Sequence, residues 1–456
     1  MNKLIFALMC LFPFSSWAES LDAPEMRASF PTMLTHPAAW LAIVIFLLCY
    51  VFVFIEEKTE LRKSKPVLIG AGLIWALVAW ANFDLGIDPE ELHNAVGSTI
   101  EEYGSLFLFL LAAMTYISAL EERQVFESLR SRLVRAAYSD RQLFWITGAI
   151  AFALSPLADN MTTSLVMGSV ILSLAGDNKR FLTLGFINVV NGANAGGAFS
   201  PFGDITTLMV WQSGKVQFLD FLPLFLPSLA CFLVPAFILS FFIPKEKPAP
   251  IILDVPMKIG SKRIIALGFL TIGLAILFEQ VFSLPAFLGM MLGLGMLLTF
   301  GYFLKKEARL REDDFDVFRL MDDTEWDTML FFFGIIFCIS GLSYLGYLEV
   351  ASGYLYEGFG PGPVNILIGI FSAGFDNIPL MFAVLSMRPE MDLFHWQLLT
   401  LTLGVGGSLL AIGSAAGVAL MGMSKGKYTF LQHLRWTPVL LLGYAAAILV
   451  HYAVNG

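Results

Sequence analysis

Charged residues are scarce in this 456-residue sequence: Asp, Glu, Lys and Arg make up 14%, against 57% for hydrophobic residues. Soluble domains carry about 25% charged residues, so this chain has too little polar surface for a water-exposed globule. No basic stripe follows the chain, which excludes a nucleic-acid partner. Apolar runs close to the ~20 residues that cross a bilayer recur along the whole length. The sequence therefore predicts an all-α polytopic membrane protein, with the lipid bilayer as its main partner.

Cysteine is also rare, with four in the chain. The first of them, Cys10, lies where a charged start, an apolar core and a small-x-small cleavage site are typical of a secretory signal. We expect residues 1–18 to be a signal peptide. The others lie in apolar segments, and we interpret them as small buried hydrophobic side chains rather than a disulfide framework or a metal site: Cys49, Cys231 and Cys338.

The placement of basic residues predicts the topology. Most of the 28 Lys and Arg residues gather in four loops: 56–65, 121–141, 245–263 and 305–319. The positive-inside rule places these loops in the cytoplasm. Three other loops contain neither Lys nor Arg and are expected in the periplasm: 82–104, 280–284 and 346–362. If the four basic loops are cytoplasmic and the three others are periplasmic, one apolar segment in each half of the chain must enter the membrane and return on the same side.

This topology predicts two inverted repeats, each with three scaffold spans, a re-entrant hairpin, a discontinuous helix and a final span. The first repeat is expected over residues 19–243, followed by a cytoplasmic linker at 244–263 and a second repeat over 264–456. The hairpins and broken helices are predicted, in chain order, at 142–176, 181–213, 361–387 and 396–423. The C-terminus is then expected in the periplasm, with the chain in a bacterial inner membrane.

Short sequence matches support the repeat. Asp159-Asn160 in the first hairpin corresponds to Asp376-Asn377 in the second, and the glycines 196, 197 and 203 correspond to 406, 407 and 413. Pro and clustered Gly near the middle of an apolar segment interrupt a helix there. Non-helical backbone at that depth must be buried in protein or line a wet cavity, where its carbonyls and the half-helix ends can bind ions. The alternative is that the glycine pairs serve only helix packing.

Three aspartates, Asp159, Asp204 and Asp376, lie in these interrupted segments. A charge at the bilayer centre costs about 2.5–3.5 kcal/mol on insertion scales, so it persists when paired, protonated or bound to a cation. No Lys or Arg occurs in the four segments apart from Arg141 at a boundary, which predicts that the aspartates lack a basic partner. A carboxylate that holds either a hard cation or a proton is an exchanger. The alternative is that each aspartate only caps a helix.

Amide and hydroxyl oxygens accompany the aspartates and suit a hard cation such as Na⁺. We predict that the ion- and proton-binding residues are Asp159, Asn160, Thr162, Asn194, Ser200, Asp204, Thr206, Thr207, Ser372, Asp376, Asn377, Ser408 and Ser414. Within this set, sodium is expected at Asp159, Asn160, Asp204 and Thr206. For the individual Ser and Thr residues, a hydrogen bond back to the helix is the alternative.

The stretches SPLADNMTTS (155–164), NAGGAFSPFGDITT (194–207) and AGFDNIP (373–379) resemble the NhaD-type Na⁺/H⁺ antiporters. These belong to the ion transporter superfamily, which also contains arsenite permeases and dicarboxylate carriers. The resemblance implies inverted repeats, separate scaffold and transport domains, a homodimer and an elevator-like movement. It also implies functional roles for the site residues named above other than Thr162 and Ser200. Because Ser414 stands where the first repeat has Asp204, the first half is expected to hold the main cation site.

The expected function is that of a secondary transporter, not an enzyme, which exchanges cytoplasmic Na⁺ or Li⁺ for periplasmic H⁺ without a cofactor. Two titrating carboxylates, Asp159 and Asp204, would make the exchange electrogenic. One alternative is an anion permease of the dicarboxylate or arsenite class, sodium-coupled or uncoupled, although three aspartates would repel an anion. An intramembrane aspartyl protease is the other, but neither aspartate lies in the Tyr-Asp or Gly-x-Gly-Asp setting of that class.

Overall fold

The computed structural model describes residues 32–136, 138–176, 178–243, 254–308, 315–322 and 324–456, and this part of the chain is helical without any strand. It contains eight helices that are long and apolar enough to cross a membrane, which confirms the prediction of an all-α membrane protein. Cys49, Cys231 and Cys338 are buried and unpaired, as interpreted from the sequence. The expected signal peptide with Cys10, and residues 244–253 of the expected linker, lie outside the described residues.

The helices of the first half follow a short 3-10 turn, η1 (Thr32–Thr35). They are α4 (Pro37–Phe54), α5 (Glu56–Thr59), α6 (Ser64–Asp84), α7 (Pro89–Glu122), α8 (Val125–Arg135), α9 (Asp140–Ala158), α10 (Asn160–Ala175), α11 (Lys179–Gly197), α12 (Ile205–Gln212), the 3-10 helix η2 (Phe218–Leu224) and α13 (Phe225–Ser240).

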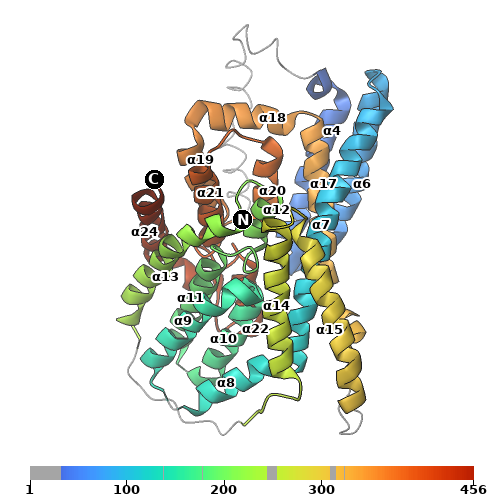
Figure 1. The fold of residues 1–456 in the computed structure, drawn as a ribbon. Helices are drawn as coiled ribbons and strands as arrows, with labels where there is room; N and C mark the ends of the chain where they lie inside the picture. The colour runs from blue at the N-terminus through green and yellow to red at the C-terminus, as the bar shows by residue number, and fades with distance from the viewer. Residues whose placement is uncertain (1–31, 137, 177, 244–253, 309–314, 323) are drawn as a thin grey trace.

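The helices of the second half run from yellow to red in Figure 1. Its helices are α14 (Ser261–Gln280), α15 (Ala286–Ala308), α16 (Val317–Asp322), α17 (Trp326–Tyr344), α18 (Tyr347–Ser352), the π-helical turn η4 (Gly353–Glu357), α19 (Pro361–Phe371), α20 (Asn377–Met387), α21 (Leu393–Gly406), α22 (Ala415–Met423), α23 (Phe430–Leu434) and α24 (Thr437–Asn455).

Helix α7 begins at Pro89, earlier than the sequence predicted. Residues 82–104 were expected to form a loop, and most of them belong to this helix instead. The Asp88 side chain accepts a hydrogen bond from the Glu90 backbone N–H at 2.9 Å, and Pro89 occupies the first helical position. Both features favour a helix start. With 34 residues at about 1.5 Å each, α7 is about 50 Å long and exceeds the ~30 Å hydrocarbon layer.

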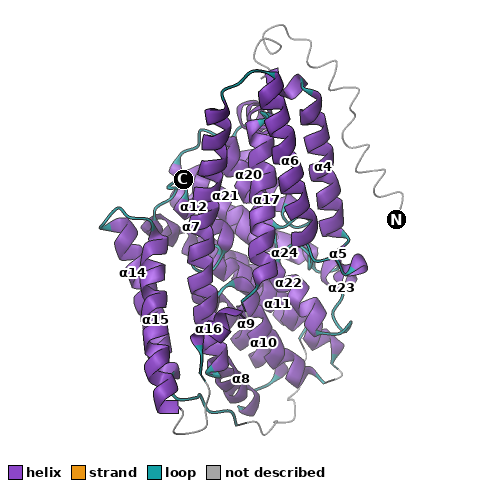
Figure 2. Cartoon of the chain, turned by 90° about the vertical axis from the view of Figure 1, so that its right-hand side faces the viewer, coloured by secondary structure: helices purple, strands orange, loops and turns teal. Residues whose placement is uncertain are grey.

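The helices form two groups, which Figure 1 shows side by side. We call α4, α6, α7, α14, α15 and α17 the panel, and α9 to α13 with α19 to α24 the core bundle. In the panel, α6 packs on α17 and α15 packs on α7; in the core bundle, α9 packs on α11, α19 on α21 and α13 on α24. The most extensive direct contact between the groups is that of α17 with α20. In Figure 2, α14 and α15 stand on one side of the panel and α4 and α6 on the other.

Two helical hairpins and two interrupted helices meet inside the core bundle. Helices α9 and α10 pack together around the turn at Asp159, and α19 leads into α20 through residues 372–376. Residues 198–204 separate α11 from α12, and residues 407–414 separate α21 from α22. Helix α10 packs against α22 and α20 packs against α12, so each hairpin contacts the broken helix of the other half.

Candidate functional site

The four helices that follow the two hairpin turns and the two helix breaks each begin at a polar cap: Asp159 for α10, Asp204 for α12, Asp376 for α20 and Ser414 for α22. The three aspartates accept the capping N–H through Oδ1, at 2.8, 2.9 and 3.3 Å respectively. A carboxylate has a second oxygen and further lone pairs for other partners. Helix capping therefore accounts for one oxygen of each aspartate and does not exclude cation binding by the other.

Asp204 lies at the centre of a buried polar cluster in the first half. Its Oδ2 accepts a hydrogen bond from Asn160 Nδ2 at 3.0 Å, and its Oδ1 accepts one from Thr206 Oγ1 at 2.8 Å. Ser155 Oγ in turn donates to Asn160 Oδ1 at 2.6 Å. The Asp204 residue is only 8% exposed. The fold thus joins the hairpin turn to the start of α12 through side chains that are 44 residues apart in sequence.

A second cluster joins the two halves of the chain. Asn194, near the end of α11, donates through Nδ2 to Ser408 Oγ and to Ser414 Oγ, both at 3.0 Å. Ser408 and Ser414 flank the break between α21 and α22. The predicted residues of the two halves are therefore adjacent in space at this point, although more than 200 residues separate them.

The remaining predicted residues take several roles. Ser372 Oγ donates to the Gly369 carbonyl at 2.7 Å, which is the bond back to the helix that the alternative predicted. Ser200 Oγ also donates to backbone, but to the Pro156 carbonyl of α9 at 2.8 Å. Thr162 contributes its backbone N–H to Asp159. Thr207 is fully buried.

Glycines allow the broken helices and hairpins to approach closely. A Cβ on Gly197 would lie 2.2 Å from Asn160 Oδ1, and one on Gly407 would lie 3.1 Å from Asn377 Nδ2, so corresponding glycines meet corresponding amides. A Cβ on Gly404 would lie 3.7 Å from Asp204 Oδ2. The glycines thus serve close packing and also let polar side chains reach the breaks.

The expectation that no basic side chain pairs with the aspartates is wrong for Asp376. Lys63 Nζ, just before α6 in the panel, lies 3.6 Å from Asp376 Oδ2. The expectation considered only the segments that carry the aspartates, and Lys63 comes from the loop 56–65 in the other half of the chain. Asp376 is therefore at the boundary of the core bundle with the panel, whereas Asp204 is inside the core bundle.

Several buried oxygens near the breaks have no hydrogen-bond partner among the described residues. They are Asn194 Oδ1, Asn377 Oδ1, Thr207 Oγ1 and Ser164 Oγ. A buried acceptor without a donor costs about 1–3 kcal/mol. Amide and hydroxyl oxygens are hard ligands of the kind that Na⁺ binds. The donor set therefore fits a transported hard cation, and no cluster of His, Cys, Asp and Glu suited to a transition metal occurs in the described residues.

Sequence reasoning missed two polar residues of the site. Ser155 orients Asn160 through the hydrogen bond given above, and Ser164 carries one of the unpartnered hydroxyls. Both lie in the stretch 155–164, one of the three that carry the resemblance to a known family. Their positions five residues before and four residues after Asn160 were a usable signal, because a hairpin returns such neighbours to its turn.

We expect Asn194→Ala to destabilise the protein, since the substitution removes both hydrogen bonds between the halves and leaves the hydroxyls of buried Ser408 and half-buried Ser414 to find new partners. The expected loss in the free energy of unfolding is about 1–3 kcal/mol. Thermal unfolding of the detergent-purified protein measures it. Asn94→Ala, at an exposed position of α7, is the control. Equal melting temperatures for the two variants would contradict the bridging role.

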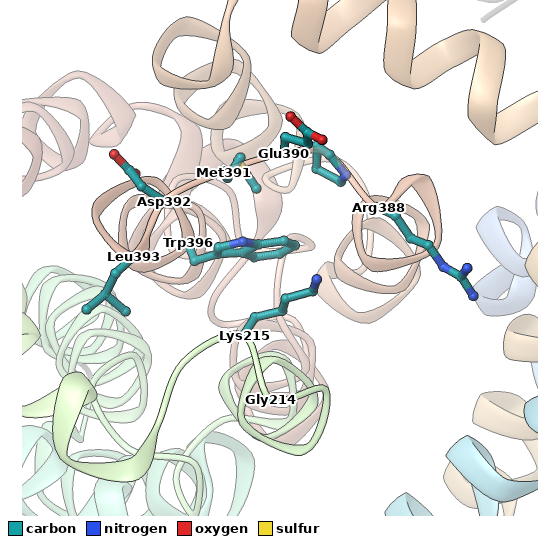
Figure 3. Close-up of a pocket in the computed structure, with 9 residues that line it drawn as sticks. Gly214, Lys215, Arg388, Glu390, Met391, Asp392, Leu393 and Trp396 are labelled. Carbon is teal, nitrogen blue, oxygen red and sulfur yellow. The ribbon is translucent and has the colours of Figure 1, made fainter.

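A surface cavity of about 610 Å³ lies away from these clusters, between the end of α12 and the start of α21. Figure 3 shows the Lys215 ammonium group alongside the Trp396 ring, 5.5 Å from its centre, with Arg388 directed away. Glu390 and Asp392 also line the cavity. None of the predicted site residues lines it, and its charges are of both signs, so we assign no ion-binding role to it.

The sequence is similar to those of known membrane transporters. The model of a family described as "Citrate transporter" matches residues 50–406. A Na⁺/H⁺ antiporter NhaD of Vibrio cholerae is 51% identical over 100% of this chain and 98% of its own length. The NhaD of Halomonas elongata is 47% identical over 99% of this chain and 94% of its own length. Sodium/proton antiporter 1 of Arabidopsis thaliana is 31% identical over 90% of this chain and 72% of its own length.

Proposed function

The chain belongs to the family of NhaD-type Na⁺/H⁺ antiporters and is a multi-pass membrane transporter, and on this basis we propose that it exchanges cytoplasmic Na⁺ or Li⁺ for periplasmic H⁺ across the bacterial inner membrane. The observation that carries the proposal is Asp204. Its carboxylate is buried inside the core bundle and its neighbours are amide and hydroxyl groups. Such a carboxylate needs either a cation or a proton to be neutral at this depth.

Competition at one carboxylate produces the exchange. When Na⁺ binds, it takes the place of the proton on Asp204, and Asn160, whose amide group is beside that carboxylate, is positioned to turn its amide oxygen toward the cation. The buried oxygens of Asn194 in α11 and Thr207 in α12, on either side of the break at residues 198–204, complete a hard-cation donor set. Asp159 supplies a second titrating carboxylate at the neighbouring hairpin turn, and two carboxylates per cation make the exchange electrogenic.

The proposed topology is that of two inverted repeats. The matched contacts support it: α6 pairs with α17 as α15 pairs with α7, and α10 pairs with α22 as α20 pairs with α12. The hairpin of the first half then has a counterpart in the second half that enters from the opposite side of the membrane. In this arrangement α9 and α10 enter from the cytoplasm, α19 and α20 enter from the periplasm, and the C-terminus is periplasmic.

The proposed movement is a displacement of the core bundle against the panel. Contacts are extensive within each group, whereas few helices join the groups directly. Rigid groups with a limited interface move relative to one another at low cost. The panel then acts as the scaffold, and in a homodimer it is the part that forms the contact between subunits.

A second candidate function rests on the family model described as a citrate transporter. A sodium-coupled or uncoupled anion permease would bind citrate, a dicarboxylate or arsenite in place of a proton. The aspartates at the helix breaks disfavour it, because the helix N-termini that would attract an anion are already capped by carboxylates.

Flux of ²²Na⁺ into proteoliposomes separates the two functions. We expect an imposed pH gradient to drive ²²Na⁺ accumulation in buffer that contains no organic anion, because the proton is the only exchange partner required. Added citrate should leave the initial rate unchanged. Accumulation that appears only when citrate or another anion is present would overturn the antiporter proposal.

A further inference from the structure

The tip of the second hairpin is fastened to the panel by an ion pair that the antiport scheme does not use. Lys63 Nζ lies 3.6 Å from Asp376 Oδ2, and the two side chains are 25% and 35% exposed. Asp376 also caps α20 through Oδ1. The pair lies beside the contact of α17 with α20, which is the most extensive direct contact between panel and core bundle.

The panel holds Lys63 in place by several interactions. Its backbone N–H donates to Glu56 Oε1 at 3.1 Å, and the next residue, Ser64, donates through Oγ to Asp327 Oδ1 at 2.5 Å. The first bond ties Lys63 to α5, and the second fixes the start of α6 against the start of α17. The Lys63 ammonium group also lies 4.4 Å from the centre of the buried Phe331 ring, at a cation–π distance. The ammonium is therefore directed at the hairpin tip by its surroundings.

Aromatic contacts surround the same tip. Phe375, which precedes Asp376, lies between Tyr50 and Phe54 of α4, with ring centres 6.0 and 5.2 Å away. In the first hairpin the corresponding residue before the aspartate is Ala158, which has no ring to offer. The tip of the second hairpin thus contacts the panel through a charged and an aromatic side chain. The first hairpin has no aromatic side chain at the corresponding position.

We propose that Lys63 is a tethered cation that occupies Asp376 when no transported cation is there, and that Na⁺ must displace it during the cycle. This inference rests on the proposed antiport and assigns Lys63 as a positioning residue for it. A carboxylate near the helix breaks needs a positive partner, and a lysine on a flexible stem is a compact point charge that can supply one and withdraw. Displacement of Lys63 also frees the hairpin tip from the panel, which couples cation arrival to movement of the core bundle.

The test is the Na⁺ concentration that gives half of the maximal thermal stabilisation of the purified protein. A ligand that binds the folded state raises the melting temperature. Choline chloride keeps the ionic strength constant, because salt alone screens a partly exposed pair. We expect Lys63→Gln to lower the half-stabilising Na⁺ concentration about two- to fivefold. This range corresponds to the interaction free energy of a partly exposed ion pair. Lys63→Arg keeps the charge and is expected to restore the wild-type value.

Two further measurements distinguish competition from a structural role. In the Asp376→Asn background, Lys63→Gln is expected to cause no further shift, because the group for which Lys63 competes is gone. In everted vesicles, Lys63→Gln is expected to lower the KM for Na⁺ and also the maximal rate, since nothing then helps to displace the bound ion. A structural role alone would not lower the KM.

The inference is overturned if Lys63→Gln leaves the half-stabilising concentration unchanged, if Lys63→Arg shifts it equally, or if the shift persists with Asp376→Asn. In each of these cases the wild type is still stabilised by Na⁺ and the proposed function stands. A wild type that Na⁺ neither stabilises nor drives in vesicles overturns the proposed function itself, and this inference with it.

Discussion

In everted membrane vesicles, we expect Asp204→Asn to abolish the recovery of acridine orange fluorescence that Na⁺ produces with the wild type. Asn has the same shape and can still accept the capping hydrogen bonds from Thr206 through its amide oxygen. It has no negative charge to bind Na⁺ and no proton to release. The fall in the exchange rate should reach about 100-fold, which corresponds to ~2.7 kcal/mol.

The matched control is Asp392→Asn. Asp392 caps α21 in the way that Asp204 caps α12, but its side chain is 67% exposed and lies in the loop before the helix. This variant should keep the wild-type response. Asp159→Asn is expected to lower the response as Asp204→Asn does, because it removes the second carboxylate. Fluorescence recovery that persists in both Asp159→Asn and Asp204→Asn would reject the assigned site.

The second large effect is expected for Gly406→Ala, at the end of α21. A Cβ at this position would lie 1.9 Å from the Gly369 carbonyl oxygen and 2.5 Å from Ser372 Oγ. The nearest atom is backbone, so it cannot turn away, and α19 and α21 must separate. Overpacking of this kind costs about 3 kcal/mol, enough to lower the melting temperature by several degrees and to reduce the yield of folded protein.

Gly422→Ala is the control for this prediction. Gly422 lies in α22, on the other side of the same break, and an added Cβ there would meet no heavy atom within 4 Å. The substitution should leave the melting temperature unchanged or raise it slightly, because Ala favours a helix over Gly. If the Gly406→Ala and Gly422→Ala variants have the same melting temperature, then α19 and α21 do not approach as closely as the structure shows.

Local residue patterns were sufficient to predict much of this protein. Apolar length predicts membrane-crossing helices, and the stretches around Asp159, Asp204 and Asp376 carry the resemblance to antiporters that the comparisons confirm. These properties depend on neighbours in sequence. A run of apolar residues crosses a bilayer whatever it packs against, and a cluster of Gly and Pro interrupts a helix through its own backbone.

The start of α7 could also have been read locally, but basic-residue placement outweighed the local signal. Asp88-Pro89 followed by glutamates is typical of a helix N-terminus. The absence of Lys and Arg in residues 82–104 indicates only on which side of the membrane this segment lies, and does not indicate that it is a loop. A topological signal carries no information on whether the segment is helical.

The sequence by itself determined the class of the protein: a helical membrane transporter with carboxylates at interrupted helices and without enough charge to be anything soluble. Only the tertiary structure decided which of those carboxylates have which partners. Lys63 reaches Asp376, Asn160 reaches Asp204, and Asn194 bonds to two serines of the other half. The physical reason is range: a helix or a membrane span forms from contacts a few residues apart, whereas a hydrogen bond or ion pair forms between whichever groups the packed helices bring within about 3–4 Å.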